Sequence, residues 1–590
     1  MQAVYNIAEI CARHGITDVV LSPGSRSAPL TLAFARHPDL TVRVVPDERA
    51  AAFIGLGIAQ AQRRAVALVC TSGTAGLNYA PAVAEAFFQQ IPLVIFTADR
   101  PPEWIDQLDG QTIRQRNLYG AHAKGAFEFP VDTAHADAKW HSARIVNEAI
   151  NLAQAAPAGP VQVNVPLREP FYPKAGEVIG YDEDMKIIRE KTPDVLLHLS
   201  QILEFRERIK ASGSALIVGG QQATNPALAA ELAKLSEACQ VPVVADSIAN
   251  LNEAGTISRH DVFLAGLPTE VKEMVYPHLL ITFGQSLISK SLKLFLRDAA
   301  PAQHWHIQLS GPVADTFRSN TEVIRMEPAA FFRQLNTPEA NEYDWKVATY
   351  LDESGKEVPH TGSGYYATAQ LIWQQVDIQA NEFLIDFFGR ENQPFNEFSG
   401  FHQVLAALLP HTALHLANSM TVRYANILGI PQGRQIEVFA NRGTSGIDGC
   451  NSTAVGAALA QPARPVVLLT GDVAFFYDRN AFWHNYPLPN LRVVLFNNHG
   501  GGIFRIIDGP RQQPELEEFF ETRQALTAEN TAKDFNLRYF PVSTFAELEA
   551  ALPVFFAAET GAAILEVFTD SKTNAAFFEE YRAAVKAAFA

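Results

Sequence analysis

The sequence has few cysteines, no long apolar run and no excess of positive charge. Its four cysteines lie far apart without C-x-x-C spacing, so they suit reduced thiols better than a zinc site or a disulfide framework. No run reaches the roughly 18 apolar residues of a membrane span. The formal net charge of -16 repels phosphate backbones and therefore disfavours nucleic acid as a general partner.

The N-terminal stretch, MQAVYNIAEICARHG, also lacks the features of a signal peptide. It has no basic start, and Glu9 interrupts its apolar residues. We therefore expect an amphipathic helix at this end. Together with the reduced thiols, this predicts a cytoplasmic protein.

What the sequence does contain is a repeated alternation of short β-branched runs and alanine-rich stretches over 590 residues. This alternation is typical of parallel strands joined by helices, so the expected fold class is α/β, with doubly wound parallel sheets. The length exceeds one hydrophobic core, and polar breaks at Tyr172 to Asp184 and at Asp352 to Ser363 predict three domains, 1–180, 181–362 and 363–590. Strands are predicted at 17–21, 42–45, 65–70, 93–97, 215–220, 241–246, 279–284, 413–416, 466–469, 493–496 and 563–567.

The most informative segment is VVLLTGDVAFFYDRNAFWHNYPLPNLRVVLFNNHGGGIF. It supplies Gly471 and Asp472 after one predicted strand, and Asn498 and Gly500 after the next. A hard cation prefers oxygen ligands, and the Asp472 carboxylate, the Asn498 amide oxygen and a carbonyl near Gly500 can converge at neighbouring strand ends. The glycines allow backbone to approach phosphates closely. Taken alone, Asp472 could instead be a helix N-cap and Asn498 part of a turn.

A second candidate is Glu48, which begins a helix directly after a strand in VRVVPDERAAAFIGLGIAQ. By itself this carboxylate is equally explained as a first-turn glutamate favoured by the helix dipole. The nearby Gly55-Leu56-Gly57 lies inside the helix and lacks the third glycine of a dinucleotide fingerprint, so we assign it no function.

Asp472 and Asn498, 26 positions apart, resemble the cofactor motif of thiamine-diphosphate enzymes. The resemblance implies thiamine diphosphate held through Mg2+, or Mn2+, by Asp472, Asn498 and Gly500, with Gly471 and Ile503 also contacting the cofactor. It implies that Glu48 hydrogen-bonds the aminopyrimidine N1′ and so activates the cofactor. Domain 1–180 would bind the pyrimidine and domain 363–590 the diphosphate, from different subunits of a homodimer or a dimer of dimers.

Four further segments, LSPGSRSAPL, TSGTAGLNYAPAVAEA, FTADRPPE and NRGTSGIDGCNSTAVGAAL, resemble the menaquinone-pathway family of 2-succinyl-5-enolpyruvyl-6-hydroxy-3-cyclohexene-1-carboxylate synthases. The resemblance spans nearly the whole chain and is thinnest in the middle. It implies a transferase that decarboxylates 2-oxoglutarate and adds the succinyl carbanion equivalent 1,4 to isochorismate. Both substrates carry two carboxylates, which arginine side chains can grip with paired hydrogen bonds.

Matching the family motifs assigns each site residue a role. Arg423 and Arg442 would hold the part derived from 2-oxoglutarate, with Ser419 and Phe504 beside them, and Ile447 would prop the cofactor in its bent shape. Each arginine alone is more often a surface or ion-paired residue. Residues facing isochorismate would be Ser25, Arg26, Arg100, Gln111 and Lys290.

Where the family has a Lys-Arg pair, this chain has Lys290-Ser291, which leaves Lys293 or Arg297 as possible replacements for the second base. Three other functions remain open at this point. An acetolactate-synthase-like ligase or a 2-oxo acid decarboxylase would share the cofactor residues. A cofactor-binding scaffold without catalysis is a second alternative. A dinucleotide-binding oxidoreductase is disfavoured because no complete G-x-G-x-x-G follows a predicted strand.

Overall fold

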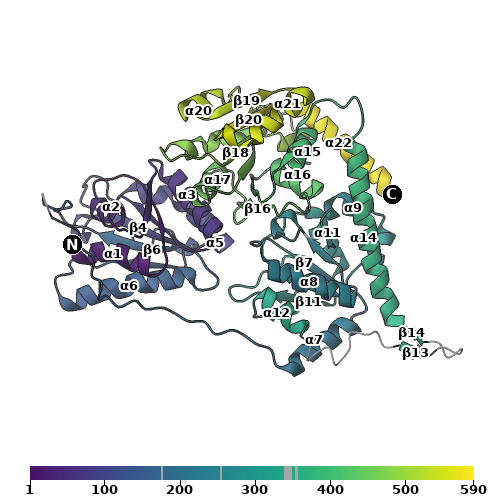
Figure 1. The fold of residues 1–590 in the computed structure, drawn as a ribbon, viewed down its shortest axis with the longest axis horizontal. Coiled ribbons are helices and arrows are strands. Elements are labelled where there is room, and N and C mark those ends of the chain that lie inside the picture. Colours follow the sequence, from purple (N-terminus) through teal and green to yellow (C-terminus); the bar gives the residue numbers. More distant parts are fainter. Residues whose placement is uncertain (175–176, 253–254, 338–348, 352–356, 360) are drawn as a thin grey trace.

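The computed structural model describes all residues except 175–176, 253–254, 338–348, 352–356 and 360 (Figure 1). In the described residues, three six-stranded parallel sheets follow one another along the chain, each flanked by helices, and a two-stranded antiparallel pair, β13 (Thr349–Leu351) and β14 (Glu357–Pro359), stands apart. The expected doubly wound α/β architecture is therefore confirmed. No described helix is long and apolar enough to cross a bilayer.

The first sheet has the strand order β2-β1-β3-β4-β6-β5. Its inner strands are buried along their whole length, as expected for parallel strands covered on both faces. The N-terminal helix expected from the sequence is present as α1 (Gln2–Arg13), which packs on α2 and α6. The other elements are β1 (Asp18–Leu21), α2 (Ala28–Ala35), β2 (Thr41–Val44), α3 (Glu48–Gln62), β3 (Val66–Cys70), α4 (Thr74–Asn78), α5 (Ala80–Gln89), β4 (Leu93–Asp99), β5 (Gly125–Glu128), α6 (Ala136–Gln154) and β6 (Val161–Pro166).

The third sheet repeats this topology. Its order is β16-β15-β17-β18-β20-β19, so counting strands from the start of each sheet gives 2-1-3-4-6-5 in both. Its elements are β15 (Ala413–Leu416), α16 (Met420–Leu428), β16 (Glu437–Ala440), α17 (Cys450–Ala460), β17 (Val466–Gly471), α18 (Asp472–Tyr477), β18 (Leu491–Asn497), α19 (Ile503–Ile506), α20 (Glu529–Asp534), β19 (Arg538–Val542), α21 (Phe545–Phe556), β20 (Ala563–Phe568) and α22 (Ser571–Phe589).

The middle sheet is built differently. Its order, β12-β11-β10-β7-β8-β9, is the Rossmann-type order 3-2-1-4-5-6 read from the other edge. Its elements are α7 (Leu199–Ala211), β7 (Ala215–Gly219), α8 (Pro226–Cys239), β8 (Val243–Ala245), β9 (Thr256–Ile257), α9 (His260–Gly266), α10 (Thr269–Met274), β10 (Leu279–Phe283), α11 (Lys290–Ala299), β11 (Gln303–Ile307), β12 (Glu322–Ile324) and α12 (Pro328–Leu335). Between this sheet and the third lie α14 (Thr361–Phe388) and α15 (Glu397–Ala407).

All eleven strands predicted from the sequence are present, with ends that differ by up to two residues. Among the described residues, seven other strands of the three parallel sheets were not predicted, and neither was the pair β13 and β14. Five of these, β5, β9, β12, β16 and β19, lie at sheet edges, where one side of the strand needs no apolar covering. The remaining two, β6 (VQVNVP) and β11 (QHWHI), carry polar residues inside the sheet and so lack a continuous apolar signal.

The segment from β6 to α7 contains no helix or strand among its described residues, and the expected linker at 172–184 lies within it. Its first part is nevertheless attached to the first sheet's helices. The Tyr181 hydroxyl donates to the Ala33 carbonyl at 2.7 Å, and Asn151 donates to the Ile188 carbonyl at 2.7 Å. Residues 191–196 are exposed and run on to α7 (Figure 1). The second expected boundary, 352–363, falls largely outside the described residues.

The first and third sheets meet through α3 and α17, which occupy the same position in the two repeated topologies. A Cβ added to Gly57 would lie 2.0 Å from the Thr453 carbonyl oxygen, and one added to Gly456 would lie 2.1 Å from the Ile54 carbonyl oxygen. The contact is therefore reciprocal, and only glycine allows it. Gly57, to which the sequence assigned no function, has a packing role.

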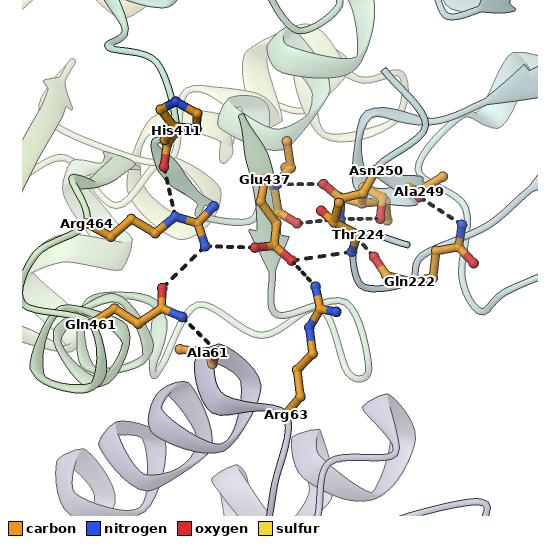
Figure 2. Close-up of polar contacts among 12 residues, drawn as sticks. Ala61, Arg63, Gln222, Thr224, Ala249, Asn250, His411, Glu437, Gln461 and Arg464 are labelled. Carbon is orange, nitrogen blue, oxygen red and sulfur yellow. Dashed lines mark hydrogen bonds and ion pairs between the residues drawn. The ribbon is translucent and has the colours of Figure 1, made fainter. Parts of the chain in front are cut away.

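All three sheets are joined at Glu437, at the start of β16 (Figure 2). Its carboxylate accepts hydrogen bonds from Arg63 at the end of α3 (3.0 Å), from the Thr224 backbone N–H beyond β7 (3.3 Å) and from Arg464 (2.8 Å). Burial alone would raise the pKa of Glu437, but these arginines outweigh it and lower the pKa. The junction thus fixes the three regions relative to one another.

Candidate active site

Four of the site residues expected in the third region come shortly after the carboxyl ends of parallel strands. Ser419 follows β15, Arg442 follows β16, Asp472 follows β17 and Asn498 follows β18. Neighbouring parallel strands end at the same edge of a sheet, which is where open α/β sheets bind ligands. Fold and prediction therefore agree on this edge.

Asp472 is a buried acid at this edge, with 2% of its surface exposed. Its carboxylate accepts from the N–H groups of Gly500 (2.7 Å) and Val473 (2.8 Å) and from the Gln524 amide (3.0 Å). Burial raises the pKa of Asp472 to about 6, against the effect of these hydrogen bonds. In the described part of the chain it has no cationic partner, so a bound cation would stabilise its charged form.

Among the residues that the structure describes, Asn498 has one amide atom with a hydrogen-bond partner and one without. Its Nδ2 donates to Glu397 at 2.9 Å, whereas its Oδ1 is buried and accepts no hydrogen bond from the described residues. Burial raises the pKa of Glu397 to about 7, with the Asn498 hydrogen bond opposing and the charge of Asp472 adding to the rise. An unpaired oxygen beside two buried carboxylates fits a hard divalent cation.

The glycine-rich turn after β18 completes this edge. A Cβ on Gly500 would lie 2.7 Å from the Glu521 carbonyl oxygen, and one on Gly502 would lie 2.9 Å from the Asn498 side chain. Beside Gly471, by contrast, no described atom lies within 4 Å of such a Cβ, which leaves room next to Asp472. The turn leads into α19, which carries Ile503 and Phe504.

Ile447 lies on the loop between β16 and α17. It packs on a small buried cluster of Ala417, Cys450 and Ala474, and Ala474 is two residues from Asp472. The loop is also held from the first region, because Glu85 of α5 accepts hydrogen bonds from the N–H groups of Gly443 (2.8 Å) and Thr444 (2.7 Å). Sequence reasoning missed Glu85; its sign was a buried acid in the apolar helix APAVAEAFFQ.

Glu48 is the first residue of α3 and is half-buried. Burial raises its pKa, and the charge of Asp47 adds to the rise. Its neighbours face the segment after Asp472: Asp47 accepts from Asn480 at 2.8 Å, and Arg49 donates to the Tyr477 carbonyl at 2.7 Å. The two cofactor-binding halves, which the resemblance implies in different subunits, thus face each other within one chain here.

Two arginines contact the residues that follow β15. Arg442 donates to the Asn418 side chain at 3.0 Å, and Arg423 donates to the Ser419 carbonyl. Burial, and next the charge of Arg442, lower the pKa of Arg423. Lys293 is also influenced by Arg442 and its pKa is lowered, mainly by burial.

The two possible replacements for the missing second base have different hydrogen-bond partners. Lys293 donates to the Leu287 carbonyl at 2.7 Å, whereas Arg297 donates to the Thr316 carbonyl at 2.9 Å. The Lys290 side chain is exposed and makes no hydrogen bond or ion pair with the described residues.

The remaining expected residues form a second group at the carboxyl edge of the first sheet. Arg26 is 7% exposed, donates to the Leu167 carbonyl at 3.0 Å and has its pKa lowered by burial and then by the charge of Arg100. Arg100 pairs with Asp109 at 3.1 Å. The exposed Ser25 precedes Arg26, and the Gln111 backbone lies against Gly73. No hydrogen bond between described residues joins this group to Lys290 or Arg442.

Comparison with known proteins agrees with this arrangement. Residues 1–121 match the N-terminal TPP binding domain of thiamine pyrophosphate enzymes, and residues 423–567 match their C-terminal TPP binding domain. In fold, the chain is similar to benzoylformate decarboxylase from Polynucleobacter necessarius, with a TM-score of 0.68 and 17% identity over 97% of this chain and 99% of the other. Fold and site thus define a thiamine pyrophosphate enzyme.

Full-length relatives narrow the class. The chain is 42% identical to a 2-succinyl-5-enolpyruvyl-6-hydroxy-3-cyclohexene-1-carboxylate synthase from Cytophaga hutchinsonii over 100% of both chains. Synthases of the same name from Flavobacterium johnsoniae (35%, covering 98% of this chain and 97% of the relative) and Porphyromonas gingivalis (36%, covering 96% and 94%) are also similar. The chain belongs to the 2-succinyl-5-enolpyruvyl-6-hydroxy-3-cyclohexene-1-carboxylate synthase family.

Proposed function

We propose that this chain uses thiamine diphosphate and Mg2+ to decarboxylate 2-oxoglutarate and to add the remaining succinyl unit 1,4 to isochorismate, giving 2-succinyl-5-enolpyruvyl-6-hydroxy-3-cyclohexene-1-carboxylate for menaquinone biosynthesis. The observation that carries the proposal is the 42% identity, over the full length of both chains, to a synthase of that name. The buried oxygen groups at the third sheet's carboxyl edge give the same chemistry a physical basis.

For the cofactor, we assign Asp472, the Asn498 Oδ1 and the Gly500 carbonyl to the cation. Gly471 and Ile503 would line the diphosphate, and Ile447 would support the bent cofactor. Bound thiamine diphosphate supplies the carbon nucleophile and the electron sink for loss of CO2. Glu48, whose pKa is raised by burial, would hold a proton at the aminopyrimidine N1′.

For the substrates, we assign Arg423 and Arg442, with Ser419 and Phe504, to the 2-oxoglutarate carboxylates. Two guanidinium groups held close together repel each other, and a bound carboxylate relieves that repulsion. We assign isochorismate to Ser25, Arg26, Arg100, Gln111 and Lys290.

The domain division 1–180, 181–362 and 363–590 is part of the proposal, and the presence of one six-stranded sheet in each segment supports it. We also propose a homodimer or a dimer of dimers in the cytoplasm. The ground for the assembly is the resemblance to the family. Within one chain, α3 packs on α17, and we expect the same two helices to meet between the chains of the dimer.

The direct test is an assay of the purified chain with thiamine diphosphate, Mg2+, 2-oxoglutarate and isochorismate. Both substrates should be consumed in equal amounts, with the product identified by mass spectrometry. Turnover of pyruvate in place of 2-oxoglutarate would instead favour an acetolactate-synthase-like ligase or a 2-oxo acid decarboxylase.

Substitution of Arg442, compared with substitution of an arginine outside the site, tests its assignment to 2-oxoglutarate. Arg442→Ala should lower kcat/KM for 2-oxoglutarate by roughly 10- to 100-fold, the loss expected for a charged hydrogen bond. Arg434→Ala is the matched control. Arg434 precedes β16 and so lies at the sheet edge opposite to Arg442, where it donates to the Ala406 and Leu408 carbonyls. Equal effects of the two substitutions would contradict the assignment of Arg442.

A further inference from the structure

The amide of Asn498 can serve a cation in only one of its two orientations. Its Oδ1 can coordinate a metal ion, whereas its Nδ2 carries two hydrogens and cannot. The two orientations have nearly the same shape, so packing alone distinguishes them poorly. A hydrogen-bond partner that accepts but does not donate is needed to fix the oxygen toward the ion.

Glu397 is such a partner. Its Oε2 lies 2.9 Å from Asn498 Nδ2, and an ionised carboxylate only accepts hydrogen bonds. The amide hydrogens therefore face Glu397. The Oδ1, buried and without a hydrogen bond from the described residues, is left on the other side.

Glu397 is in turn fixed by its surroundings. It is the first residue of α15 and is 5% exposed. Asn574 of α22 holds it twice, because its Oδ1 accepts from the Glu397 backbone N–H at 2.9 Å and its Nδ2 donates to the carboxylate at 3.3 Å. Asn574 Nδ2 also donates to Thr569 Oγ1 at 2.9 Å. The carboxylate thus has little freedom to leave Asn498.

We propose that Glu397 is a positioning residue that orients the Asn498 amide as a ligand for the cofactor's cation. It acts through Asn498. The inference rests on the proposed use of a metal-bound cofactor, and it assigns a role to a buried acid that no sequence motif indicates. Groups that orient metal ligands in this way typically change metal affinity by about 10- to 100-fold when removed.

The test is a double-substitution cycle read by Mn2+ binding. Mn2+ bound to the protein with thiamine diphosphate is counted by electron paramagnetic resonance. Glu397→Ala should weaken Mn2+ by about 10- to 100-fold. Glu397→Gln should weaken it less, because the new side-chain oxygen can still accept from Asn498.

The decisive comparison uses Asn498→Asp, since a carboxylate has two oxygens and needs no orientation. In that background, Glu397→Ala should cost little Mn2+ affinity, because nothing remains to be oriented. An equal loss in both backgrounds would overturn the proposal, and so would unchanged Mn2+ affinity of Glu397→Ala in the wild-type background.

Glu566→Ala is a matched control for burial. Glu566 is fully buried and accepts from the neighbouring Asn497 side chain at 2.7 Å. Its removal should lower the melting temperature but should act additively with Asn498→Asp. Mn2+ binding by the wild type distinguishes failure of the proposed function from failure of this inference. No binding would refute the proposed function itself. Normal binding by both the wild type and Glu397→Ala would refute only the role of Glu397.

Discussion

The first and third regions share one topology but differ in the residues after their third and fourth strands. Both have the order 2-1-3-4-6-5. After these two strands, the first region has Thr71 and Arg100, whereas the third has Asp472 and Asn498. At these two strand ends, the first region thus suits an anion and the third a cation. The comparison shows that a few residues at strand ends, and not the fold, decide the chemistry.

The largest expected effect comes from making the third edge like the first. Asp472→Thr replaces the buried carboxylate by the residue type found at position 71. We expect turnover to fall by about 10³-fold, because a charged group at the cation is lost. Calorimetry should show that Mg2+ no longer strengthens thiamine diphosphate binding. Retention of that Mg2+ effect would show that Asp472 is not a ligand.

The first region's contribution is tested by Glu48→Gln. We expect a fall of about 10²-fold or more in kcat, because the amide cannot hold the proton as the carboxyl does. Cofactor binding, followed by calorimetry, should remain. Asp106→Asn is the control, since Asp106 is an exposed acid on the surface of the same region. Undiminished kcat in Glu48→Gln would remove Glu48 from the mechanism.

Mixing the two inactive chains shows which first region serves which third region. If sites form between chains of a homodimer, random mixing of Glu48→Gln with Asp472→Thr should restore about a quarter of the wild-type rate, because half of the dimers then contain one intact site. If each site forms within one chain, in the way that α3 contacts α17 within this chain, mixing should restore no activity. Analytical ultracentrifugation should establish the assembly in parallel.

The two pseudo-equivalent helices are capped differently, and this predicts a pH dependence. Asp47 caps its own helix, α3, whereas α17 is capped from outside by Asp478, which accepts from Ser452 N at 2.6 Å and Oγ at 2.7 Å. Burial raises the pKa of Asp478 to about 7.

Between the unfolded pKa of about 4 and the folded value, the native state binds more protons than the unfolded state. The contribution of Asp478 to stability is therefore complete below pH 4 and is lost as the pH rises through 7. Asp478→Asn should flatten this part of the pH profile of the urea unfolding free energy by about 4 kcal/mol, since each pKa unit corresponds to about 1.4 kcal/mol. A profile identical to that of the wild type would contradict the assignment.

The smallest expected effect concerns the helix crossing. Gly57→Ala and Gly456→Ala should each destabilise the protein by about 1–3 kcal/mol in urea unfolding, because each methyl group meets a backbone carbonyl. Gly55→Ala is the control within α3: its methyl would meet the end of the Leu68 side chain, which can move. A larger loss of unfolding free energy for Gly55→Ala than for Gly57→Ala and Gly456→Ala would contradict the role of the reciprocal α3–α17 contact.

The sequence predicted the elements that carry their own local signal. Inner strands with continuous apolar runs were predicted, whereas the inner strands β6 and β11 were not. Motifs in which strand, turn and spacing coincide made Glu48, Asp472 and Asn498 candidates. Edge strands such as β5 and β19 were missed because one open side weakens the apolar pattern. The positions of Lys290 and Lys293 relative to Arg442 depend on how two sheets meet, which no single segment encodes.

The supporting residues could not be predicted because their partners are remote. Glu397 contacts Asn498 across 101 positions, and Glu85 contacts Gly443 across 358. In the sequence, each is an ordinary helix glutamate. Its hydrogen-bond partner is determined by tertiary packing, and burial makes that hydrogen bond specific.

The segment between β6 and α7 limits how far the first region can travel. Because residues around Tyr181 and Ile188 are hydrogen-bonded to the first region, only the exposed residues 191–196 act as a free tether. Six extended residues reach about 20 Å. A third region further away than this can be reached only if the segment around Tyr181 and Ile188 first detaches from the first region. The stability of that attachment therefore determines whether the first region pairs with the third region of its own chain or with that of a neighbour.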